Sequence, residues 1–519
     1  MNQQSKTASI WHATSEGTKY PQLSGDISVD VAIVGGGITG LTAAVLLQRN
    51  GLNVALLEAS RIGSGVTGNT TAHISEVPDM GYRQLIASLG EEQAQRVVQS
   101  RRIAIETIAS FVKTDKIDCE FERLSGYLYA ESESEVSQLE RETQAARKLG
   151  VSASAIADVP LPFPVKGGIL FSNQAQFHAL KYLQGLANAF TGEGGKIYEE
   201  SRVLDIDMDR DPIAMSTPGG KVTAKEVILA TIMPIHDLLK MQEILPLTTK
   251  AAPYRSYVMG VRLDGISAPK GLFWDTAQPY HYTRRYNTPA GEMLIVGGED
   301  HKTGQEIDET ECYRNLEQYL RDRYPIAAID YRWSAQLYEP VDGLPFIGSS
   351  ALHPHLHFAT GYSGNGMSFG TIAGLIFSDS ILGEKNPWAK LYDPNRFNLV
   401  ASAQGFLSEN IEVAKHFIGD RFKSDVHSLS QVPLKEGRIA EVGGEQVAVY
   451  RDESGNLHTL SPVCTHAHCI VNWNAAEKSW DCPCHGGRFS ATGEVLNGPP
   501  IKELQQRALL GGSTTPSRD

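Results

Sequence analysis

Cysteine is scarce in this sequence, and most of it lies in one short segment. Only six cysteines occur among 519 residues, which is too few for a secreted scaffold built on disulfide bonds. Four of the six fall within 21 residues, and they are Cys464, Cys469, Cys482 and Cys484. Such crowding predicts one local site rather than a set of scattered cross-links.

Basic residues are also in deficit. The chain has 47 Lys and Arg against 60 Asp and Glu, a formal net charge of −13, which argues against non-specific binding to nucleic acid or to an anionic membrane surface. No basic cap followed by an apolar run is visible at the N-terminus, and the apolar stretch after Asp30 is broken by closely spaced glycines. We therefore expect a cytoplasmic protein with no nucleic-acid partner and no integral membrane segment. The chain does have the composition of a globular protein, 41% apolar and 21% charged, and a length that predicts about three domains.

A glycine motif lies between two predicted strands near the N-terminus. The apolar runs 29–34 and 54–57 are typical of buried parallel strands, and 41–48 has the spacing of a helix. The motif is GxGxxG, formed by Gly35, Gly37 and Gly40. It permits a tight turn and brings a pyrophosphate to the helix N-terminus, while Glu58, at the end of the second strand, is placed to accept hydrogen bonds from an adenosine ribose. This unit predicts a dinucleotide-binding domain.

Further segments of the same kind follow along the chain. In order they are a run of small residues at 61–71, a buried strand at 227–231, the segment Asp342–Gly348, a strand at 357–360 and a glycine turn at 361–367. A helix is predicted over 368–382, directly after that turn. Its N-terminal dipole would favour an anionic or electron-rich group.

Together these segments resemble the FAD-dependent oxidoreductases related to D-amino-acid oxidase, glycine oxidase and sarcosine oxidase, over about residues 28–390. The resemblance implies non-covalent FAD in an α/β Rossmann-like domain, with an antiparallel substrate-domain sheet (α+β) over the flavin ring. The cofactor-binding residues that it implies are Gly35, Gly37, Ile38, Thr39, Gly40, Glu58, Ala59, Thr67, Thr70, Thr71, Val203, Ala230, Gly361, Gly364, Gly366 and Met367. Among these, Val203 would touch the adenine, and the turn 361–367 would approach the flavin ring.

One departure from the family concerns the substrate. The amino-acid oxidases of this family grip the substrate carboxylate with an arginine on the strand before the Asp-Gly segment, and an ungapped alignment places Leu337 at that position. The arginine clamp is therefore expected to be missing, which weakens an assignment to simple amino acids. Arg255, Arg284 and Arg285 could replace it from neighbouring strands, although each also fits an ordinary structural or surface role.

The expected substrate sheet offers only weak candidates for catalysis. On a strand, Tyr280, Tyr282 and Arg284 would share one face, with His281, Thr283 and Arg285 on the other. The aromatic residues predict either a pocket for a cationic or planar amine or simple sheet packing. We leave the catalytic residues unassigned, with His281, Tyr282, Arg284 and His301 as candidates; His301 is expected in a loop, where it could act as an acid/base group or be structural.

The C-terminal part differs from the rest of the chain. Residues 406–422 predict an amphipathic helix, and from about Val432 short strands alternate with glycine turns, at 439–442, 446–450 and 458–460. This pattern predicts a small all-β domain. It contains the four crowded cysteines within the sequences Cys-x-His and Cys-x-x-His, which are separated by 15 residues. Structural zinc is one interpretation of such spacing.

The two extra cysteines, Pro483 and Gly486-Gly487 make the segment resemble a Rieske [2Fe–2S] motif instead. The resemblance makes Cys464 and Cys482 ligands of one iron and His466 and His485 ligands of the other, and it implies a disulfide between Cys469 and Cys484. Gly487 and Phe489 stand where a serine and a tyrosine donate hydrogen bonds to the sulfurs in high-potential Rieske proteins. Without these donors we expect a reduction potential in the lower or middle part of about −150 to +300 mV.

These observations predict the following organisation. The expected parts are an FAD-dependent module at 1–395, a helical linker at 396–425, a Rieske domain at 426–511 and a flexible tail at 512–519. Within the module, the FAD-binding parts are expected at about 28–80, 165–235 and 335–395, and the substrate-domain parts at about 81–164 and 236–334.

The predicted activity combines the two cofactors. FAD would dehydrogenate a C–N bond of a small or secondary amine or an amino-acid-like substrate, and electrons would pass singly to the cluster and to an external acceptor. Two alternatives remain: a flavin and iron–sulfur electron carrier or redox sensor without turnover, and a reductase in which the cluster feeds the flavin.

Overall fold

The computed structural model describes residues 8–233, 250–288, 291–305, 308–396 and 424–508. The chain divides into two compact units. The first unit comprises Met1–Pro234, Leu238–His301 and Cys312–Phe406, and the second comprises Ile235–Asp237, Lys302–Glu311 and Leu407–Asp519. The helix expected at 406–422 and the tail expected at 512–519 lie outside the described residues.

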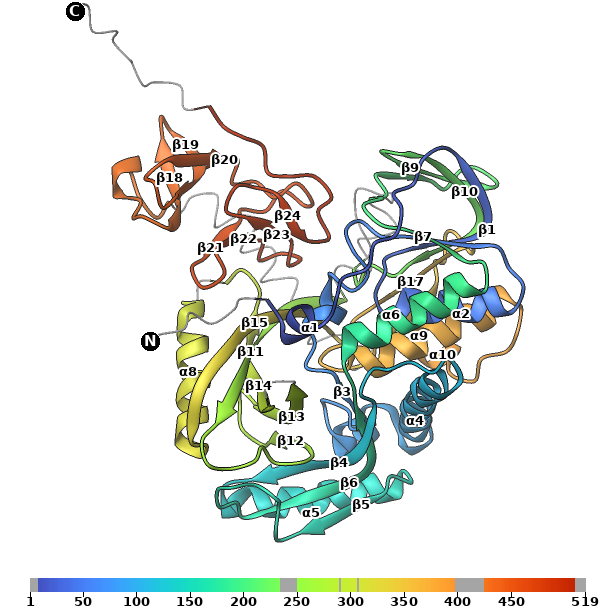
Figure 1. The fold of residues 1–519 in the computed structure, drawn as a ribbon, viewed down its shortest axis with the longest axis vertical. Coiled ribbons are helices and arrows are strands. Elements are labelled where there is room, and N and C mark those ends of the chain that lie inside the picture. Colours follow the sequence, from blue (N-terminus) through green and yellow to red (C-terminus); the bar gives the residue numbers. More distant parts are fainter. Residues whose placement is uncertain (1–7, 234–249, 289–290, 306–307, 397–423, 509–519) are drawn as a thin grey trace, which may run out of the picture. The chain divides into compact units, whose positions relative to one another are not determined.

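The first unit contains an eight-stranded sheet whose centre is parallel (Figure 1). Its main order is β16 (Phe346–Ser349), β17 (Leu356–Thr360), β10 (Gly220–Leu229), β1 (Ile27–Val34), β2 (Val54–Leu57) and β7 (Lys196–Tyr198). β8 (Asp205–Asp207) and β9 (Ile213–Thr217) extend it through β10. Pairs such as Ile33 with Ile228 and Leu56 are fully buried, as the continuous apolar runs predicted.

Helices cover this sheet and bury its apolar faces. They are α2 (Ile38–Arg49), α6 (Ala179–Gly192), α9 (Gly366–Ile381) and α4 (Glu91–Thr114), with the short α1 (Ile10–Thr14), α10 (Ala389–Tyr392) and η1 (Val66–Asn69) beside them. α2 packs against α9 and α6, and α4 packs against α9. Small residues allow close approach here, since a side chain at Gly374 would come within 2.6 Å of Thr42.

A second, nine-stranded sheet completes the first unit. Its order is β15 (Ile326–Pro340), β11 (Ala251–Leu263), β14 (Gly291–Lys302), β13 (Tyr282–Thr288), β12 (Leu272–Asp275), β4 (Glu122–Ala130), β6 (Gly167–Gln176) and β3 (His73–Ile74), with β5 (Ala153–Ile156) beside β6. The expected antiparallel sheet is found, with one parallel pair, β12 with β4. α8 (Glu309–Arg323) packs on one face through Leu316 and Leu320, while α3 (Tyr82–Leu89) and α5 (Glu133–Lys148) lie near its other end.

The sheet corrects two boundaries that we expected inside the first unit. Residues 167–176 and 335–340 were assigned to the FAD-binding part, but they belong to β6 and β15 of the second sheet. The physical reason is backbone hydrogen bonding, because β6 pairs with β4 up to Gln176 and β15 pairs with β11 up to Pro340.

The second unit is mostly β structure. β18 (Glu436–Val442), β19 (Glu445–Arg451) and β20 (Leu457–Leu460) form one sheet, preceded by η4 (Leu429–Gln431). β21 (Asn472–Asn474), β22 (Ser479–Asp481), β23 (Arg488–Ser490) and β24 (Val495–Asn497) form the other. Trp480 and Phe489 are fully buried between these sheets.

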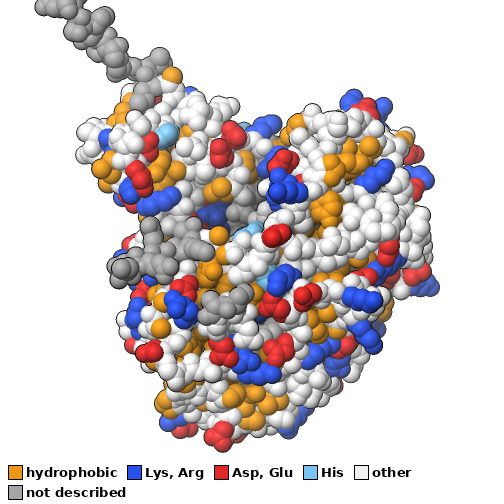
Figure 2. Space-filling view, viewed as in Figure 1, with side chains coloured by type: hydrophobic (Ala, Val, Ile, Leu, Met, Phe, Trp, Pro, Cys, Tyr) orange, Lys and Arg blue, Asp and Glu red, His pale blue; other side chains and the backbone are white. Residues whose placement is uncertain are grey.

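Charges are mixed at the surface. Among the described residues visible in Figure 2, acidic and basic side chains are interspersed. Some of them form ion pairs, such as Arg262 with Asp330 at 2.6 Å and Arg321 with Glu317 at 2.7 Å. Of the helices in the described part of the chain, none is long and apolar enough to cross a membrane.

Candidate cofactor sites and active site

The glycine motif forms a strand–turn–helix in which two glycines are sterically required. Gly35 follows β1 with a φ of 111°, and a Cβ there would lie 2.6 Å from the carbonyl oxygen of Ala230 at the end of β10. A Cβ at Gly40 would lie 2.1 Å from the carbonyl oxygen of Gly35. Gly37 caps α2 without a side chain, and the next amide, of Ile38, donates to the Thr67 hydroxyl at 3.3 Å. The N-terminus of α2 therefore has no capping side chain of its own, which fits a phosphate at this place.

Glu58 lies beside this turn, directly after β2. Its carboxylate accepts hydrogen bonds from the Gly36 amide at 2.7 Å and the Ser60 amide at 2.8 Å. Burial raises the pKa of Glu58, and these two bonds oppose that rise. Ala59 follows in the same loop, and Val203 is buried with 3% of its surface exposed. A carboxylate fixed beside the α2 N-terminus fits the ribose of a dinucleotide.

The segment 67–72, which is expected to line the middle of the cofactor, is held by side chains from elsewhere in the first unit. The indole of Trp333 donates to the carbonyl of Asn69 at 2.9 Å, and that of Trp11 donates to the carbonyl of Thr70. Arg284 donates to the carbonyls of Thr71 at 3.0 Å and Ala72 at 2.9 Å, and also to that of Phe177. The sequence did not reveal these roles of Trp11 and Trp333, because both are remote from residues 67–72 along the chain.

The glycine turn 361–367 precedes α9 and is held by hydrogen bonds from the segment after β3 and from α4. Asp79 accepts the Gly364 amide at 2.9 Å, and Arg101 donates to the Asn365 side chain and to the carbonyl of Ser75. Tyr362 is hydrogen bonded to Thr39 of α2 at 3.0 Å. The turn is therefore fixed against both α2 and the segment after β3.

Open space lies over the end of this turn. A Cβ at Gly366 would meet no atom within 4 Å, although the following residue, Met367, is 4% exposed. Gly361 has a φ of 77°, which only glycine adopts without strain. An open helix N-terminus next to a rigid turn fits an electron-rich ring, as the flavin part of FAD requires.

Side chains from the second sheet, from the loop before β13 and from the segment after β3 approach one another beside Gly364. The Ser256 hydroxyl of β11 lies 2.7 Å from the Tyr282 hydroxyl of β13, and Ser256 also hydrogen bonds to Asp300 of β14. A Cβ at Gly364 would lie 3.3 Å from both the Tyr280 hydroxyl and an Asp79 carboxylate oxygen. Asp79 and Asp300 had no motif to mark them in the sequence.

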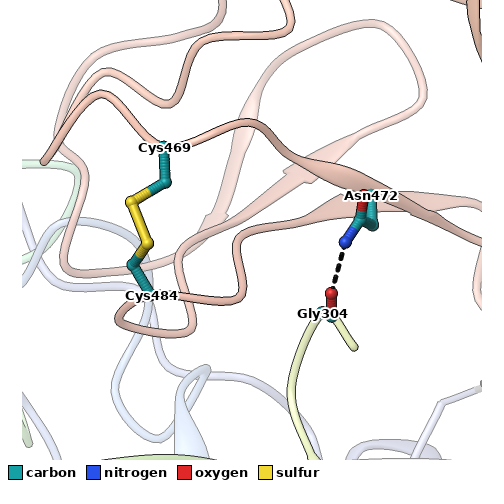
Figure 3. The surroundings of a disulfide bond; sticks show 4 residues. All are labelled: Gly304, Cys469, Asn472 and Cys484. Atoms are coloured by element: carbon teal, nitrogen blue, oxygen red, sulfur yellow. Dashed lines mark hydrogen bonds between the residues drawn. A yellow bond between two sulfur atoms is a disulfide. The ribbon is translucent and has the colours of Figure 1, made fainter. Parts of the chain in front are cut away.

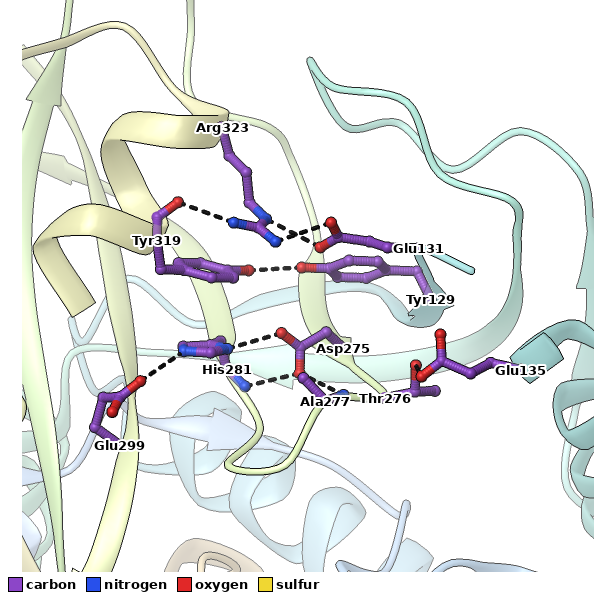
Figure 4. A network of polar contacts seen from close by, with 10 residues as sticks. All are labelled: Tyr129, Glu131, Glu135, Asp275, Thr276, Ala277, His281, Glu299, Tyr319 and Arg323. Carbon is purple, nitrogen blue, oxygen red and sulfur yellow. Dashed lines mark hydrogen bonds and ion pairs between the residues drawn. The ribbon is translucent and has the colours of Figure 1, made fainter. Parts of the chain in front are cut away.

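His281 lies in a network of polar contacts with Asp275 and Glu299 (Figure 4). Its Nδ1 lies 2.9 Å from Asp275 and its Nε2 lies 3.2 Å from Glu299, and its ring stacks on Tyr319 at 3.8 Å. Burial lowers the pKa of His281, but the hydrogen bonds that its ring donates to the two carboxylates outweigh burial and raise the pKa to about 9. Both ring nitrogens are thus hydrogen bonded to carboxylates, which hold the imidazolium in place next to β13.

The other candidates for the substrate site each contact residues of the protein itself. Arg284 is fully buried against the segment 71–72, and burial lowers its pKa to about 9. Arg285 pairs with Glu292 at 3.1 Å, and Arg255 donates to Ser334. His301 corrects our expectation of a loop, because it lies in β14, where ladder hydrogen bonds extend to Lys302, and it contacts the Tyr257 hydroxyl at 2.9 Å.

The two Cys/His loops of the second unit come together. Residues 464–469 lie between β20 and β21, and residues 482–487 lie between β22 and β23. The Cys464 and Cys482 thiols are hydrogen bonded to each other and almost fully buried, and the His466 and His485 rings are 5.0 Å apart. The amides of His466 and Ala467 donate to the Cys464 sulfur, and those of Cys484 and His485 donate to the Cys482 sulfur. Two thiols and two imidazoles facing each other, with amides directed at the sulfurs, fit a Rieske cluster.

A disulfide joins the same two loops (Figure 3). It links Cys469 and Cys484, as the resemblance implied, and both of its sulfurs lie within 4.8 Å of the Cys482 sulfur. The segment 302–311, which we expected in the substrate domain, belongs to this second unit. The reason is local packing, since the Gly304 carbonyl accepts the Asn472 amide at 2.5 Å and a Cβ at Gly304 would lie 2.7 Å from the Pro483 nitrogen.

The two positions expected to lack hydrogen-bond donors are both buried. A Cβ at Gly487 would lie 3.6 Å from the Cys464 sulfur but only 2.7 Å from Cδ of Pro500. Phe489 is fully buried in β23. A side chain at position 487 would therefore have to displace Pro500 before it could reach the sulfur.

Comparison with known proteins agrees with this geometry. Residues 30–380 match the family of FAD dependent oxidoreductases that includes D-amino-acid oxidase, and residues 423–508 match the Rieske [2Fe-2S] domain. A Bacillus subtilis protein named as a Rieske 2Fe-2S iron-sulfur protein, YhfW, is 34% identical over 498 residues and covers 96% of both chains. The gamma-glutamylputrescine oxidoreductase of Escherichia coli is 26% identical over 377 residues, 70% of this chain and 86% of that protein. Glycine oxidase from Geobacillus kaustophilus shares the fold, with a TM-score of 0.60 and 20% identity over 71% of this chain and 99% of its own.

The chain is therefore an FAD-dependent oxidoreductase. More particularly, it belongs to the D-amino-acid oxidase family and carries a Rieske domain in the same chain, so its cofactors are FAD and a [2Fe–2S] cluster.

Proposed function

We propose that this protein dehydrogenates a C–N bond of a small or secondary amine or an amino-acid-like substrate and passes the electrons singly to an external acceptor. The observation that carries this proposal is the presence of a flavin module and a Rieske domain in one chain. FAD supplies a two-electron acceptor and the cluster a one-electron carrier. In the balanced reaction, the substrate loses a hydride from carbon and a proton from nitrogen and becomes an imine, and two electrons leave one at a time.

The residues around the flavin module have positioning roles in this proposal. The α2 N-terminus and Glu58 would hold the pyrophosphate and the ribose, and the segment 67–71 would line the middle of the cofactor. Arg284 would keep that segment in place through its carbonyls. The turn 361–367, fixed by Asp79, would hold the flavin ring against the second sheet.

The residues of the second unit would hold the cluster. Cys464 and Cys482 would bind one iron and His466 and His485 the other, and the disulfide would keep the two loops together. The contact of Cys482 with both disulfide sulfurs supports this role.

Amine oxidation is supported by the aromatic and polar face near Gly364 and by the likeness to a relative named gamma-glutamylputrescine oxidoreductase. An electron carrier or sensor would need no such face. A reductase in which the cluster feeds the flavin would need a one-electron donor as its partner, and a dehydrogenase needs an acceptor. A cytoplasmic location remains a prediction.

Anaerobic mixing of the purified protein with a panel of amines tests the direction and the chemistry. We expect the flavin absorbance to bleach first and the cluster signal in electron paramagnetic resonance to rise afterwards. In a Cys464→Ser control, which lacks a cluster ligand, bleaching should persist without a cluster signal. No bleaching with any amine would favour the carrier, and flavin reduction only after the cluster has been reduced chemically would favour the reductase.

A further inference from the structure

The face of the second sheet that meets the glycine turn can be assigned from strand register. Leu337 of β15 is paired with Tyr254 of β11, and Ser256 lies two residues further on the same face. The alternate residue Tyr257 packs with Leu316 of α8, so that α8 covers the opposite face. Side chains on the Leu337 face therefore point away from α8 and toward the rest of the first unit.

The three arginines that could grip a carboxylate on this face have other contacts. Arg255 lies on the alternate face of β11 and donates to Ser334. Arg284 donates to the carbonyls of Thr71 and Ala72, and Arg285 pairs with Glu292. None of these contacts directs a guanidinium toward Gly364, the point of the turn that faces this sheet.

Carboxylates, rather than guanidinium groups, lie near Gly364 on this face of the sheet. Asp300 is hydrogen bonded by Ser256, and its Oδ1 is buried and accepts no hydrogen bond within the described residues. Burial, with the nearby charges of Glu339 and Asp79, raises the pKa of Asp300 to about 7. His281 is a cation in its surroundings, and its nitrogens are already held by other carboxylates. A buried carboxylate oxygen without a donor, among further acids, is stabilised by a bound cation.

Tyr280 and Tyr282 lie close to these carboxylates. The Tyr280 and Tyr282 rings are 5.5 Å apart, and burial raises the pKa of both, with Asp300 and Asp79 adding to the rise. The Tyr280 hydroxyl and Asp79 border Gly364 at the same distance. We call these four residues, Asp79, Asp300, Tyr280 and Tyr282, the acid–tyrosine cluster.

We propose that the acid–tyrosine cluster binds the cationic end of an aliphatic diamine or polyamine whose other amine is oxidised. This inference rests on the proposed amine dehydrogenation and names its substrate class. The reacting nitrogen must be neutral to give up a hydride from its neighbouring carbon, so the carboxylates are of use to a second, remote ammonium that keeps its charge. Carboxylates and tyrosine faces both attract an ammonium, and they repel the carboxylate of an amino acid.

Stopped-flow reduction of the holoenzyme tests this inference with matched substrates. Putrescine and spermidine carry a remote ammonium, butylamine has a hydrogen atom in its place, and 4-aminobutyrate has a carboxylate in place of the terminal carbon and its ammonium. We expect the ratio of the reduction rate constant to the dissociation constant to be roughly tenfold or more higher for the diamine than for butylamine. 4-Aminobutyrate should react more slowly than butylamine.

Substitutions of Asp300 test whether its carboxylate binds the remote ammonium. Asp300→Asn should raise the dissociation constant for putrescine roughly tenfold or more and leave that for butylamine unchanged, and Asp300→Glu should restore part of the affinity. Asp330→Asn, which alters an exposed acid paired with Arg262 on β15, is the matched control and should behave as wild type. FAD content and visible spectrum show whether each variant is folded.

The outcomes separate this inference from the proposed function. Perturbation of the flavin spectrum by putrescine without bleaching, lost in Asp300→Asn, would keep the cation site and overturn amine dehydrogenation. Bleaching by butylamine or sarcosine that equals bleaching by putrescine, unchanged in Asp300→Asn, would keep dehydrogenation and overturn the cation site. No spectral response to putrescine or to spermidine would also overturn the cation site.

Discussion

The two cofactor sites of this protein are assembled in different ways. The cluster site takes its two cysteines and two histidines from two loops, within the 22 residues from Cys464 to His485, and the disulfide between Cys469 and Cys484 joins these loops. The flavin site draws on residues from Trp11 to Met367, and its central segment is held by side chains that are more than 50 residues away in the chain. One site is local in sequence, and the other depends on the whole first unit.

This difference predicts different responses to substitution. A local site fails completely when one ligand is lost, because each ligand is a bond to the metal. A distributed site loses affinity in steps, because each side chain holds only part of the backbone that forms it. The largest effect of a single substitution is therefore expected at the cluster site.

Cys464→Ser should abolish the cluster and spare FAD. A serine hydroxyl does not replace a thiolate on iron at neutral pH, so the Rieske signal in electron paramagnetic resonance should vanish, with FAD content near wild type. Cys119→Ala, which removes a buried free thiol from the first unit, is the control and should retain both cofactors. A Cys464→Ser protein with a full cluster signal would remove Cys464 from the ligand set.

Arg284→Met should weaken FAD binding without abolishing it. The substitution leaves the carbonyls of Thr71, Ala72 and Phe177 without their donor, at a cost of about 1–3 kcal/mol. That cost corresponds to a roughly 5- to 150-fold higher dissociation constant for FAD. Equilibrium dialysis or flavin fluorescence measures it.

Arg285→Met is the matched control, because the exposed pair of Arg285 with Glu292 contributes little. Equal loss of FAD in both variants would show that residues 71 and 72 are not held by Arg284.

The same contrast explains what could be predicted from the sequence. The glycine motif, the strands at 29–34 and 54–57 and the Cys/His loops could be predicted because their residues are neighbours in the chain. The roles of Trp11, Arg101 and Asp300 could not, because each contacts residues that are remote in sequence and follows no periodic pattern. For the same reason the boundaries expected at about 165 and 335 fall inside or beside β6 and β15, since the pairing of these strands with β4 and β11 decides which sheet they join.

His281 should make the stability of the first unit depend on pH. Its pKa is raised to about 9 from an ordinary 6.5, so its stabilising contribution is fully present below about pH 6.5 and is lost as the pH rises through about 9. The upper limit of that loss is about 3 kcal/mol. Flavin release on heating at pH 6, 8 and 10 measures it, and His281→Gln should flatten the dependence.

A control for this prediction is His355→Gln, which removes an exposed histidine that precedes β17 and pairs with Glu226. If wild type and His281→Gln lose stability in parallel between pH 8 and 10, the contacts with Asp275 and Glu299 do not hold a proton on His281.

The smallest effect should come from residues near the cluster that are not ligands. We expect a reduction potential in the lower or middle part of about −150 to +300 mV, because Phe489 and Gly487 provide no hydroxyl to the sulfurs. Phe489→Tyr, at a fully buried position, should raise the potential by roughly tens of millivolts, whereas Phe489→Leu should not. Gly487→Ser should raise it less than the tyrosine does, because Pro500 occupies the space that its Cβ needs. Redox titration followed by electron paramagnetic resonance measures all four proteins, and a wild-type value at the top of the range would contradict the role given to the missing donors.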